Sequence, residues 1–350
     1  MMIAVLRPGP PAGKAPFHKR MERRASFDIG SGSTKIQISD VQNGTLIQTL
    51  FSEERPVAFG LDLVQSLNEN LSEEIQTKGL QTIGELKQIA EAHGASKFAA
   101  IATEVFRKSK NGNVYLDKVR SMGISVILVT QDIEAELGFR TVVAVSKEDP
   151  INACVWDSGG ASFQITSLDS SSDRPVLRKY MGALGTSISA GILLKEIRGA
   201  TLTNFMAINP VTQDEALKLV AAITARLSEV PPWLDGRDVV SASAGINSLF
   251  KLCADIIACR ATDGGGDSAP PAAAAEFTLP QAEAALTACA GQPDAGLLRY
   301  QSFPHAEGPH VVVPKLALLV AVMRRTRVRR VRCVECVGSC PGLLVSDHYW

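Results

Sequence analysis

The chain has 350 residues, 45% of them hydrophobic, and its 36 basic and 36 acidic side chains give a formal net charge of zero. This length predicts two lobes with a sizeable core, and the neutral balance argues against a general polyanion binder. No apolar run reaches the ~20 residues that cross a bilayer, so we expect no membrane partner. Seven cysteines, an odd number, do not suggest a disulfide framework, and we expect a reducing, cytoplasmic location.

Residues 1–24 form a basic leader with six lysines and arginines, one acid (Glu22) and four prolines. This composition predicts a disordered segment, because it offers too little apolar surface to support a fold. The alternative is an organelle-targeting peptide, which is also basic and poor in acids. The prolines and the lack of serine argue against that alternative.

The first candidate phosphate loop lies in residues 26–38, Ser-Phe-Asp-Ile-Gly-Ser-Gly-Ser-Thr-Lys-Ile-Gln-Ile. An apolar strand reaches Asp28, a tight turn follows, and an alternating strand leaves it. Glycine in such a turn lets the main chain approach a ligand closely, and successive N–H groups can point at one anion. A β-hairpin without a ligand is the alternative.

The next elements predict one α/β lobe. A hairpin turns at Asn43-Gly44, two helices broken near Gly79 fit the apolar spacing of residues 61–93, and residues 97–103 form a strand. Arg107 follows that strand, where its planar guanidinium can meet phosphate oxygens. A surface arginine without a ligand is the alternative.

A helix starting near residue 130 carries a group of acids. The three acidic side chains stand at alternate positions, Asp132, Glu134 and Glu136. The helix dipole favours acids in a first turn, and this structural explanation covers all three. Glu134 differs from the others because it shares a helix face with Gly138 and Thr141, whose small side chains leave room for a ligand or a close neighbour.

The second candidate loop repeats the form of the first in residues 155–165, Val-Trp-Asp-Ser-Gly-Gly-Ala-Ser-Phe-Gln-Ile. Asp157 ends an apolar strand, and Gly159 and Gly160 form the turn. Two such turns, each opening one half of the chain, predict two related lobes that face a phosphate-bearing ligand.

The rest of the second half gives weaker signals. A strand that ends near Gly245 offers a third phosphate-loop candidate, although a plain strand-to-helix turn explains it equally well. Residues 261–275 are rich in glycine, alanine and proline and predict a flexible insertion. Residues 311–323 read as a strand followed by a helix, and residues 338–343 as a turn into a strand.

Two features of the last part remain open. Arg324–Arg332 holds six arginines in nine residues, which form either a solvated surface or a patch for polyphosphate or nucleic-acid phosphates. Three nearby cysteines, Cys333, Cys336 and Cys340, could bind zinc together with His348. We expect simple thiols instead, because no matching His or Cys pair lies nearby.

The two loops resemble those of the exopolyphosphatase and guanosine pentaphosphate phosphatase family, which belongs to the actin, sugar-kinase and heat-shock ATPase superfamily. The family's first loop resembles Asp-Ile-Gly-Ser-Asn-Ser and its second Asp-Ile-Gly-Gly-Gly-Ser-Thr-Glu. Residues 103–107 resemble its Thr-Ser/Ala-x-x-Arg segment, and residues 130–137 its Ser-Gly-Glu-Glu-Glu-Ala-Arg-Leu segment. The resemblance runs from about residue 25 to residue 245.

This resemblance implies an α/β fold of two ribonuclease-H-like, actin-like ATPase lobes with an interlobe cleft. The lobes would span residues 25–145 and 146–350. It also implies the site residues: Glu134, Arg107 and Gln164 for catalysis, Gly30, Ser31, Gly32, Ser33, Gly159, Gly160, Ala161, Ser162 and Gly245 for phosphate, and Asp28 and Asp157 for Mg²⁺. Glu134 falls on the family's catalytic base, whereas the family has glutamate where Gln164 stands.

We therefore expect an Mg²⁺-dependent hydrolase that releases terminal phosphate from polyphosphate or from nucleotides like guanosine penta- and tetraphosphate. Two alternatives share the fold. Gly-Gly-Ala-Ser-x-Gln also resembles nucleoside-triphosphate diphosphohydrolases, and the departures at Ile133, Glu136 and Gln164 allow a non-hydrolysing phosphate sensor. A sugar or acetate kinase fits the fold but not the segments at 103–107 and 130–137. We expect no nucleic-acid partner, and a homodimer stays open.

Overall fold

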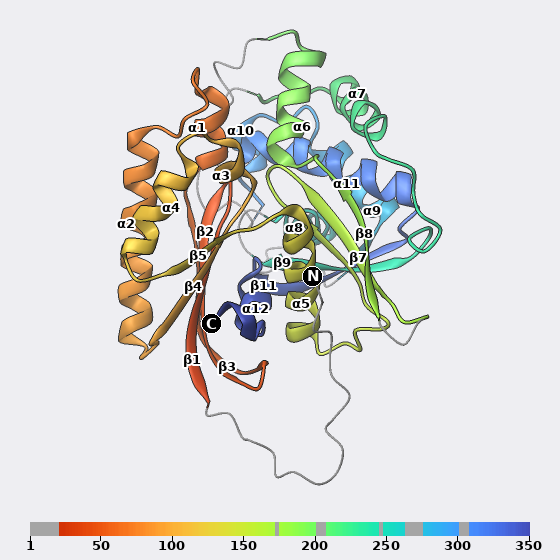
Figure 1. Cartoon of the computed structure of the whole chain (residues 1–350). Helices are drawn as coiled ribbons and strands as arrows, with labels where there is room; N and C mark the ends of the chain where they lie inside the picture. The colour runs from red at the N-terminus through yellow and green to blue at the C-terminus, as the bar shows by residue number, and fades with distance from the viewer. Residues whose placement is uncertain (1–20, 172–174, 201–207, 245–247, 263–275, 301–307) are drawn as a thin grey trace.

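Figure 1 shows the computed structural model of the chain, two α/β lobes around a pair of central sheets. The structure describes residues 21–171, 175–200, 208–244, 248–262, 276–300 and 308–350. Three predicted features therefore lie outside the described residues: residues 1–20 of the leader, Gly245, and residues 263–275 of the insertion expected at 261–275.

The first lobe is built on a five-stranded sheet in the order β3-β2-β1-β4-β5. Strand β1 pairs antiparallel with β2 and parallel with β4, and β4 pairs parallel with β5. The elements are β1 (Glu22–Ile29), β2 (Ser33–Gln42), β3 (Thr45–Pro56), α1 (Phe59–Gln65), α2 (Glu73–Ala92), β4 (Lys97–Ala102), α3 (Glu104–Lys108), α4 (Gly112–Ser121), β5 (Ser125–Leu128) and α5 (Gln131–Ser146).

The second lobe repeats this plan in a six-stranded sheet, β10-β11-β9-β6-β7-β8. Its elements are β6 (Cys154–Ser158), β7 (Phe163–Asp169), β8 (Val176–Gly182), α6 (Thr186–Ile192), the π-helix Leu193–Ile197, α7 (Gln213–Thr224), β9 (Asp238–Ala244), α8 (Leu249–Thr262), β10 (Glu276–Thr278), α9 (Leu279–Cys289), α10 (Asp294–Leu297), the 3₁₀-helix Pro309–Val311, α11 (Val312–Thr326), β11 (Arg330–Val337), α12 (Cys340–Leu344) and the 3₁₀-helix Asp347–Tyr349.

The two sheets have the same internal pattern. Strands β6, β7 and β8 pair antiparallel in sequence, as β1, β2 and β3 do. Strand β9 then pairs parallel with β6, and β11 with β9, as β4 and β5 do in the first lobe. Strand β10 is an addition at the edge. The predicted two-lobed fold is therefore confirmed.

Helices cover the first sheet on both faces (Figure 1). On one face, α2 and α4 bury apolar side chains such as Leu86 and Leu116 against β1 and β2, in a cluster with Phe27 and Ile36. On the other face, Ile101 of β4 packs with residues of α5 and α12. The periodic apolar side chains of the strands and helices thus form the cores that their spacing predicts.

Helix α2 runs unbroken through Gly79, so the expected break there was wrong. A Cβ at Gly79 would lie 2.5 Å from both Phe59 and Tyr115. The glycine lets α2 pack closely against two aromatic rings, and this tertiary contact outweighs its poor helix propensity.

Two assignments near the end of the chain were also wrong. Residues 311–323 hold no strand, because the segment begins as a 3₁₀ turn and continues as α11. Pro314 falls in the first turn of α11, where its missing N–H removes no intrahelical bond. Residues 338–343 turn into helix α12 rather than into a strand.

The segment after β11 leaves the second sheet and returns to the first lobe, where α12 packs on β1 and α5 (Figure 1). Arg24 of β1 anchors it. The guanidinium donates to the carbonyl of Leu344 and to Asp347, both at 2.9 Å, and lies over the ring of Trp350. Because β1 begins at Glu22, the last residues of the predicted leader are part of the sheet, and Arg24 is only 4% exposed.

Among the described residues, no helix combines the length and the apolar character that crossing a membrane requires.

Candidate active site

The two predicted loops are matching β-hairpins. In the first, which joins β1 to β2, the N–H of Gly30 donates to the carbonyl of Ser33 at 3.0 Å. In the second, which joins β6 to β7, the N–H of Gly159 donates to the carbonyl of Ser162 at 2.9 Å. The repeated sequence therefore folds into a repeated turn.

Each hairpin places a polar side chain directly across from its aspartate. Asp28 pairs in register with Lys35, and Asp157 pairs in register with Gln164. Cross-strand partners lie on the same face of a sheet with their Cβ atoms about 5 Å apart. The two lobes thus present a similar pair, one with a cation and one with a neutral amide.

The loops meet across the cleft. A Cβ at Gly160 would lie 3.3 Å from the Cβ of Ser31 and 3.4 Å from the Oγ of Ser187. The N–H of Ser187, at the start of α6, donates to the carbonyl of Gly160 at 2.8 Å. Ser31 from one lobe and Gly160 from the other therefore border the same space, together with the N-terminus of α6.

Arg107 and Glu134, far apart in sequence, form an ion pair at the cleft. The Nη1 of Arg107 lies 2.8 Å from Oε1 of Glu134, and the same nitrogen donates to the carbonyl of Val129. The side chain of Glu134 is only 10% exposed. Helix α5 begins at its cap Thr130, whose hydroxyl accepts from the N–H of Ile133, so Glu134 projects from the first turn.

The two neighbouring acids point to other partners. Asp132 is exposed and forms an ion pair with Lys179 at 2.6 Å. Glu136 pairs with Arg140 one turn further along α5, at 2.9 Å. Among the three acids of this helix, Glu134 is the buried one.

The small-residue face of α5 accommodates close neighbours. A Cβ at Gly138 would lie 3.3 Å from Oδ2 of Asp157, so the helix approaches that carboxylate directly. Thr141 accepts from the N–H of Gly342 at 2.9 Å. Glu134 and Asp157 are consequently held near each other by the close packing of α5.

The buried acids titrate unusually. Burial raises the pKa of Glu134 to about 7, although the hydrogen bond and the charge of Arg107 lower it. Burial and then the carboxylate of Asp28 raise the pKa of Asp157 to about 6. Burial alone would lower the pKa of Lys35, but the charges of Asp28, Glu54 and Asp157 outweigh it and raise that pKa. These groups therefore share one electrostatic environment.

The two loop serines differ in their hydrogen bonds. Ser33 donates to Oε1 of Glu54 at 2.7 Å, so its proton is engaged. Ser162 instead accepts from Nε2 of Gln164 at 3.0 Å, so the hydroxyl proton of Ser162 is not used in this bond. Gln164 is buried and orients Ser162.

The donor set at the cleft fits magnesium. Asp28 and Asp157 offer hard carboxylate oxygens, and Mg²⁺ usually takes one or two carboxylates, the rest of its ligands being water and substrate phosphates. The described residues hold no group of three or more His, Cys, Asp or Glu arranged for a metal. The three cysteines of the last segment, Cys333, Cys336 and Cys340, form no disulfide with one another, and the thiol of Cys340 contacts the carbonyl of Ser26.

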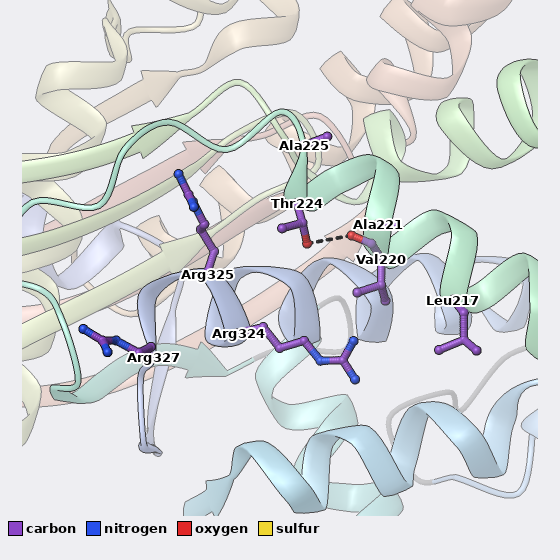
Figure 2. A pocket seen from close by; sticks show the side chains of 8 residues that line it. All are labelled: Leu217, Val220, Ala221, Thr224, Ala225, Arg324, Arg325 and Arg327. Atoms are coloured by element: carbon purple, nitrogen blue, oxygen red, sulfur yellow. Dashed lines mark hydrogen bonds between the residues drawn. The ribbon is translucent and has the colours of Figure 1, made fainter.

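The arginine-rich stretch lies away from these loops, around the end of α11. A groove of about 650 Å³ lies beside α7, and its lining includes Arg324, Arg325 and Arg327, whose side chains are drawn in Figure 2. Five of the six arginines form ion pairs, with Glu283, Asp235, Asp238 and Glu148 as partners. This pairing favours the solvated surface over a phosphate patch.

Three features of the site were missed in the sequence. Lys35 could have been found, because a hairpin centred on Ser31 and Gly32 places it opposite Asp28. Glu54 and Lys315 gave no such signal. Lys315 of α11 is 3% exposed and lies within electrostatic reach of Glu54, and burial lowers its pKa to about 8. The turn at Gly338 was predicted, but its contact with Asp28 was not.

Part of the chain matches a known protein family. Residues 37–190 match the model of the Ppx/GppA phosphatase family. A search of curated proteins found no match. The match includes Arg107, Glu134 and the second loop, so the resemblance seen in the sequence is confirmed.

Several solved structures share the fold over nearly the whole chain. A Ppx/GppA family member from Aquifex aeolicus is 18% identical and superposes with a TM-score of 0.66, covering 94% of this chain and 98% of that one. An exopolyphosphatase from Cytophaga hutchinsonii is 16% identical, with a TM-score of 0.70 and coverages of 93% and 97%. An exopolyphosphatase-like protein is 17% identical, with a TM-score of 0.71 and coverages of 95% and 98%.

Proposed function

We propose that this chain, a relative of the Ppx/GppA phosphatases in sequence and fold, hydrolyses a phosphoanhydride bond and releases terminal phosphate. The substrate class that we favour is inorganic polyphosphate, with nucleotides like guanosine penta- and tetraphosphate as the second class. The observation that carries the proposal is the buried Glu134, held by Arg107 beside two glycine loops from opposite lobes.

The loops supply the binding surface for the terminal phosphate. Ser31 and Gly160 border the space from opposite lobes. The hydroxyl oxygen of Ser162 accepts a hydrogen bond from Gln164, so its hydroxyl proton can be donated to the phosphate. Lys35 adds a positive charge within electrostatic reach of Asp28 and Asp157. These groups would hold the phosphate chain in line for attack from the Glu134 side.

Glu134 is the group that can take a proton from water. Its pKa of about 7 lies close to neutral pH, where a general base combines ionisation with basicity. Arg107 keeps the carboxylate oriented and offers its remaining N–H groups to the transferred phosphate. Asp28 and Asp157 would hold Mg²⁺, which when bound neutralises charge on the phosphate oxygens.

The test of this function is phosphate release, measured with long-chain polyphosphate and then with guanosine and adenosine nucleotides, in the presence of Mg²⁺. Release from polyphosphate or from a guanosine polyphosphate supports the hydrolase and names its substrate. Binding of these compounds with no release from any of them would contradict it and support the phosphate sensor instead.

Activity should depend on pH through Glu134. A general base works when ionised, so kcat/KM should fall about tenfold per pH unit below pH 7 and level off above it, because the pKa of Glu134 is about 7. The measurement is kcat/KM between pH 5 and 9 at saturating Mg²⁺, and a flat profile would contradict this role of Glu134.

Replacing Lys35 with methionine should separate substrate binding from metal binding. Loss of a charged hydrogen-bond donor would raise KM for polyphosphate at least about tenfold. Removing a cation near Asp28 and Asp157 should not weaken the binding of Mg²⁺. Lys87→Met, on the outer helix α2 and paired with Glu91, is the control. Unchanged KM in Lys35→Met would show that the ammonium does not touch the substrate.

A further inference from the structure

The turn after β11 reaches Asp28 from the far end of the chain. The N–H of Ser339 donates to Oδ2 of Asp28 at 2.9 Å, and both groups are buried. This contact joins a strand of the first lobe to residues that follow the last strand of the second. Oδ1 of Asp28 lies on the other side, toward the Gly30 turn.

Gly338 makes this approach possible. Its φ is +53°, in the region that residues with a Cβ adopt at a cost. A Cβ there would also lie 2.3 Å from Oδ2 of Asp28 and 2.7 Å from Cδ of Lys35. The backbone at Gly338 therefore covers both members of the Asp28–Lys35 pair, and it leaves no room for a side chain.

We propose that the Gly338–Ser339 turn is a positioning element of the active site, which fixes Asp28 so that one carboxylate oxygen remains for the cation. The Ser339 N–H occupies Oδ2 and fixes the rotation of the carboxylate. A single well-placed oxygen suits a small cation with strict octahedral geometry. This inference rests on the proposed function, in which Asp28 holds Mg²⁺.

Other contacts hold the segment in place independently of this bond. Ser26 donates to the carbonyl of Cys340 at 3.1 Å. Arg24 binds Leu344 and Asp347, and Gly342 binds Thr141. Removing one N–H at Ser339 should therefore change the placement of Asp28 without detaching the segment.

A matched pair of substitutions at one position tests the proposal. Ser339→Pro removes the N–H, and the φ of −85° at this residue lies near the range that proline adopts. Ser339→Ala keeps the N–H and removes only the hydroxyl. Mg²⁺ binding without substrate is measured by titration calorimetry, and Mg²⁺ activation is measured from phosphate release.

The expected result is a half-saturating Mg²⁺ concentration at least about tenfold higher in Ser339→Pro, as for loss of a hydrogen bond to a charged group, with Ser339→Ala like the wild type. The proposal is overturned if Ser339→Pro binds Mg²⁺ as tightly as the wild type. If wild type releases no phosphate from any substrate, the proposed function fails, but the calorimetric comparison still decides the positioning role.

A second pair covers the case in which Ser339→Pro does not fold. Gly338→Ala forces a methyl group against Asp28, whereas Gly236→Ala has a similar φ of +66° with no atom within 4 Å of the added Cβ. Both substitutions place an alanine at a positive φ, where a Cβ is unfavourable. Weaker Mg²⁺ binding in Gly338→Ala alone supports the proposal, and equal binding in both variants contradicts it.

Discussion

Glu134→Gln should lower phosphate release by about 10²- to 10⁴-fold, the usual contribution of a general base, with little change in KM. Glutamine keeps the shape and the hydrogen-bonding oxygen beside Arg107 but cannot accept a proton from water. Release is measured at pH 8, where wild-type Glu134 is ionised. The control is Glu136→Gln on the same helix, because Glu136 pairs with Arg140 instead.

Release that is unchanged in Glu134→Gln would move the base elsewhere. Asp132 would be the next acid to test, although its exposure and its pairing with Lys179 argue against it. A variant that loses both activity and binding would show that Glu134 shapes the cleft instead of acting on water.

The same substitution should stabilise the fold at neutral and higher pH. Burial raises the pKa of Glu134 from 4.5 to about 7, so wild type loses stability as pH rises from 4.5 through 7. Glutamine does not titrate. The unfolding free energy of Glu134→Gln, relative to wild type, should therefore grow by up to about 3 kcal/mol across that window and stay constant above it. Denaturant unfolding at pH 5 and 8 measures the difference.

Arg107→Met should also lower the rate of phosphate release strongly, and it should in addition shift the pH profile of activity. Removing a cation that stabilises charge on the transferred phosphate costs about 10²- to 10³-fold in rate. Arg107 also lowers the pKa of Glu134. Without it, the pKa of Glu134 should rise above 7 and the pH profile should move to more alkaline values.

The full pH profile of kcat/KM distinguishes the loss of charge stabilisation on the phosphate from the change in the pKa of Glu134. Arg107→Lys, which keeps the charge but not the planar fork, should retain the wild-type midpoint better than Arg107→Met. Arg140→Met is the control, because it removes an arginine that pairs with Glu136 on the same helix. If Arg107→Met lowers kcat/KM but leaves the midpoint of the pH profile unchanged, Arg107 does not set the pKa of Glu134.

The local parts of the site were the predictable ones. Asp28, Asp157 and their glycine turns carry a repeated pattern within about ten residues, and a short hairpin folds from its own sequence. Glu134 and Arg107 could be proposed one at a time from the resemblance and from helix faces. Their direct contact at 2.8 Å required the fold, because no pattern in the sequence states which strand ends meet.

The unpredicted parts depend on tertiary contacts. Gly79 looked like a helix break but makes room for Phe59 and Tyr115. Gly338 looked like an ordinary turn before a strand, and its role becomes visible only when Asp28, 311 positions earlier, lies against Ser339. Local propensity is a weak guide at such positions, because packing between distant segments overrides it.

The contact between Ser339 and Asp28 also has a consequence for synthesis. A ribosome adds about 5 to 20 residues per second, so roughly 10 to 40 seconds pass between completion of β5 and arrival of Ser339. During that interval the nascent first lobe would have its phosphate loop but not the amide that orients Asp28. A partly made chain would therefore lack the amide that orients Asp28, and we expect it to need more Mg²⁺ than the finished chain.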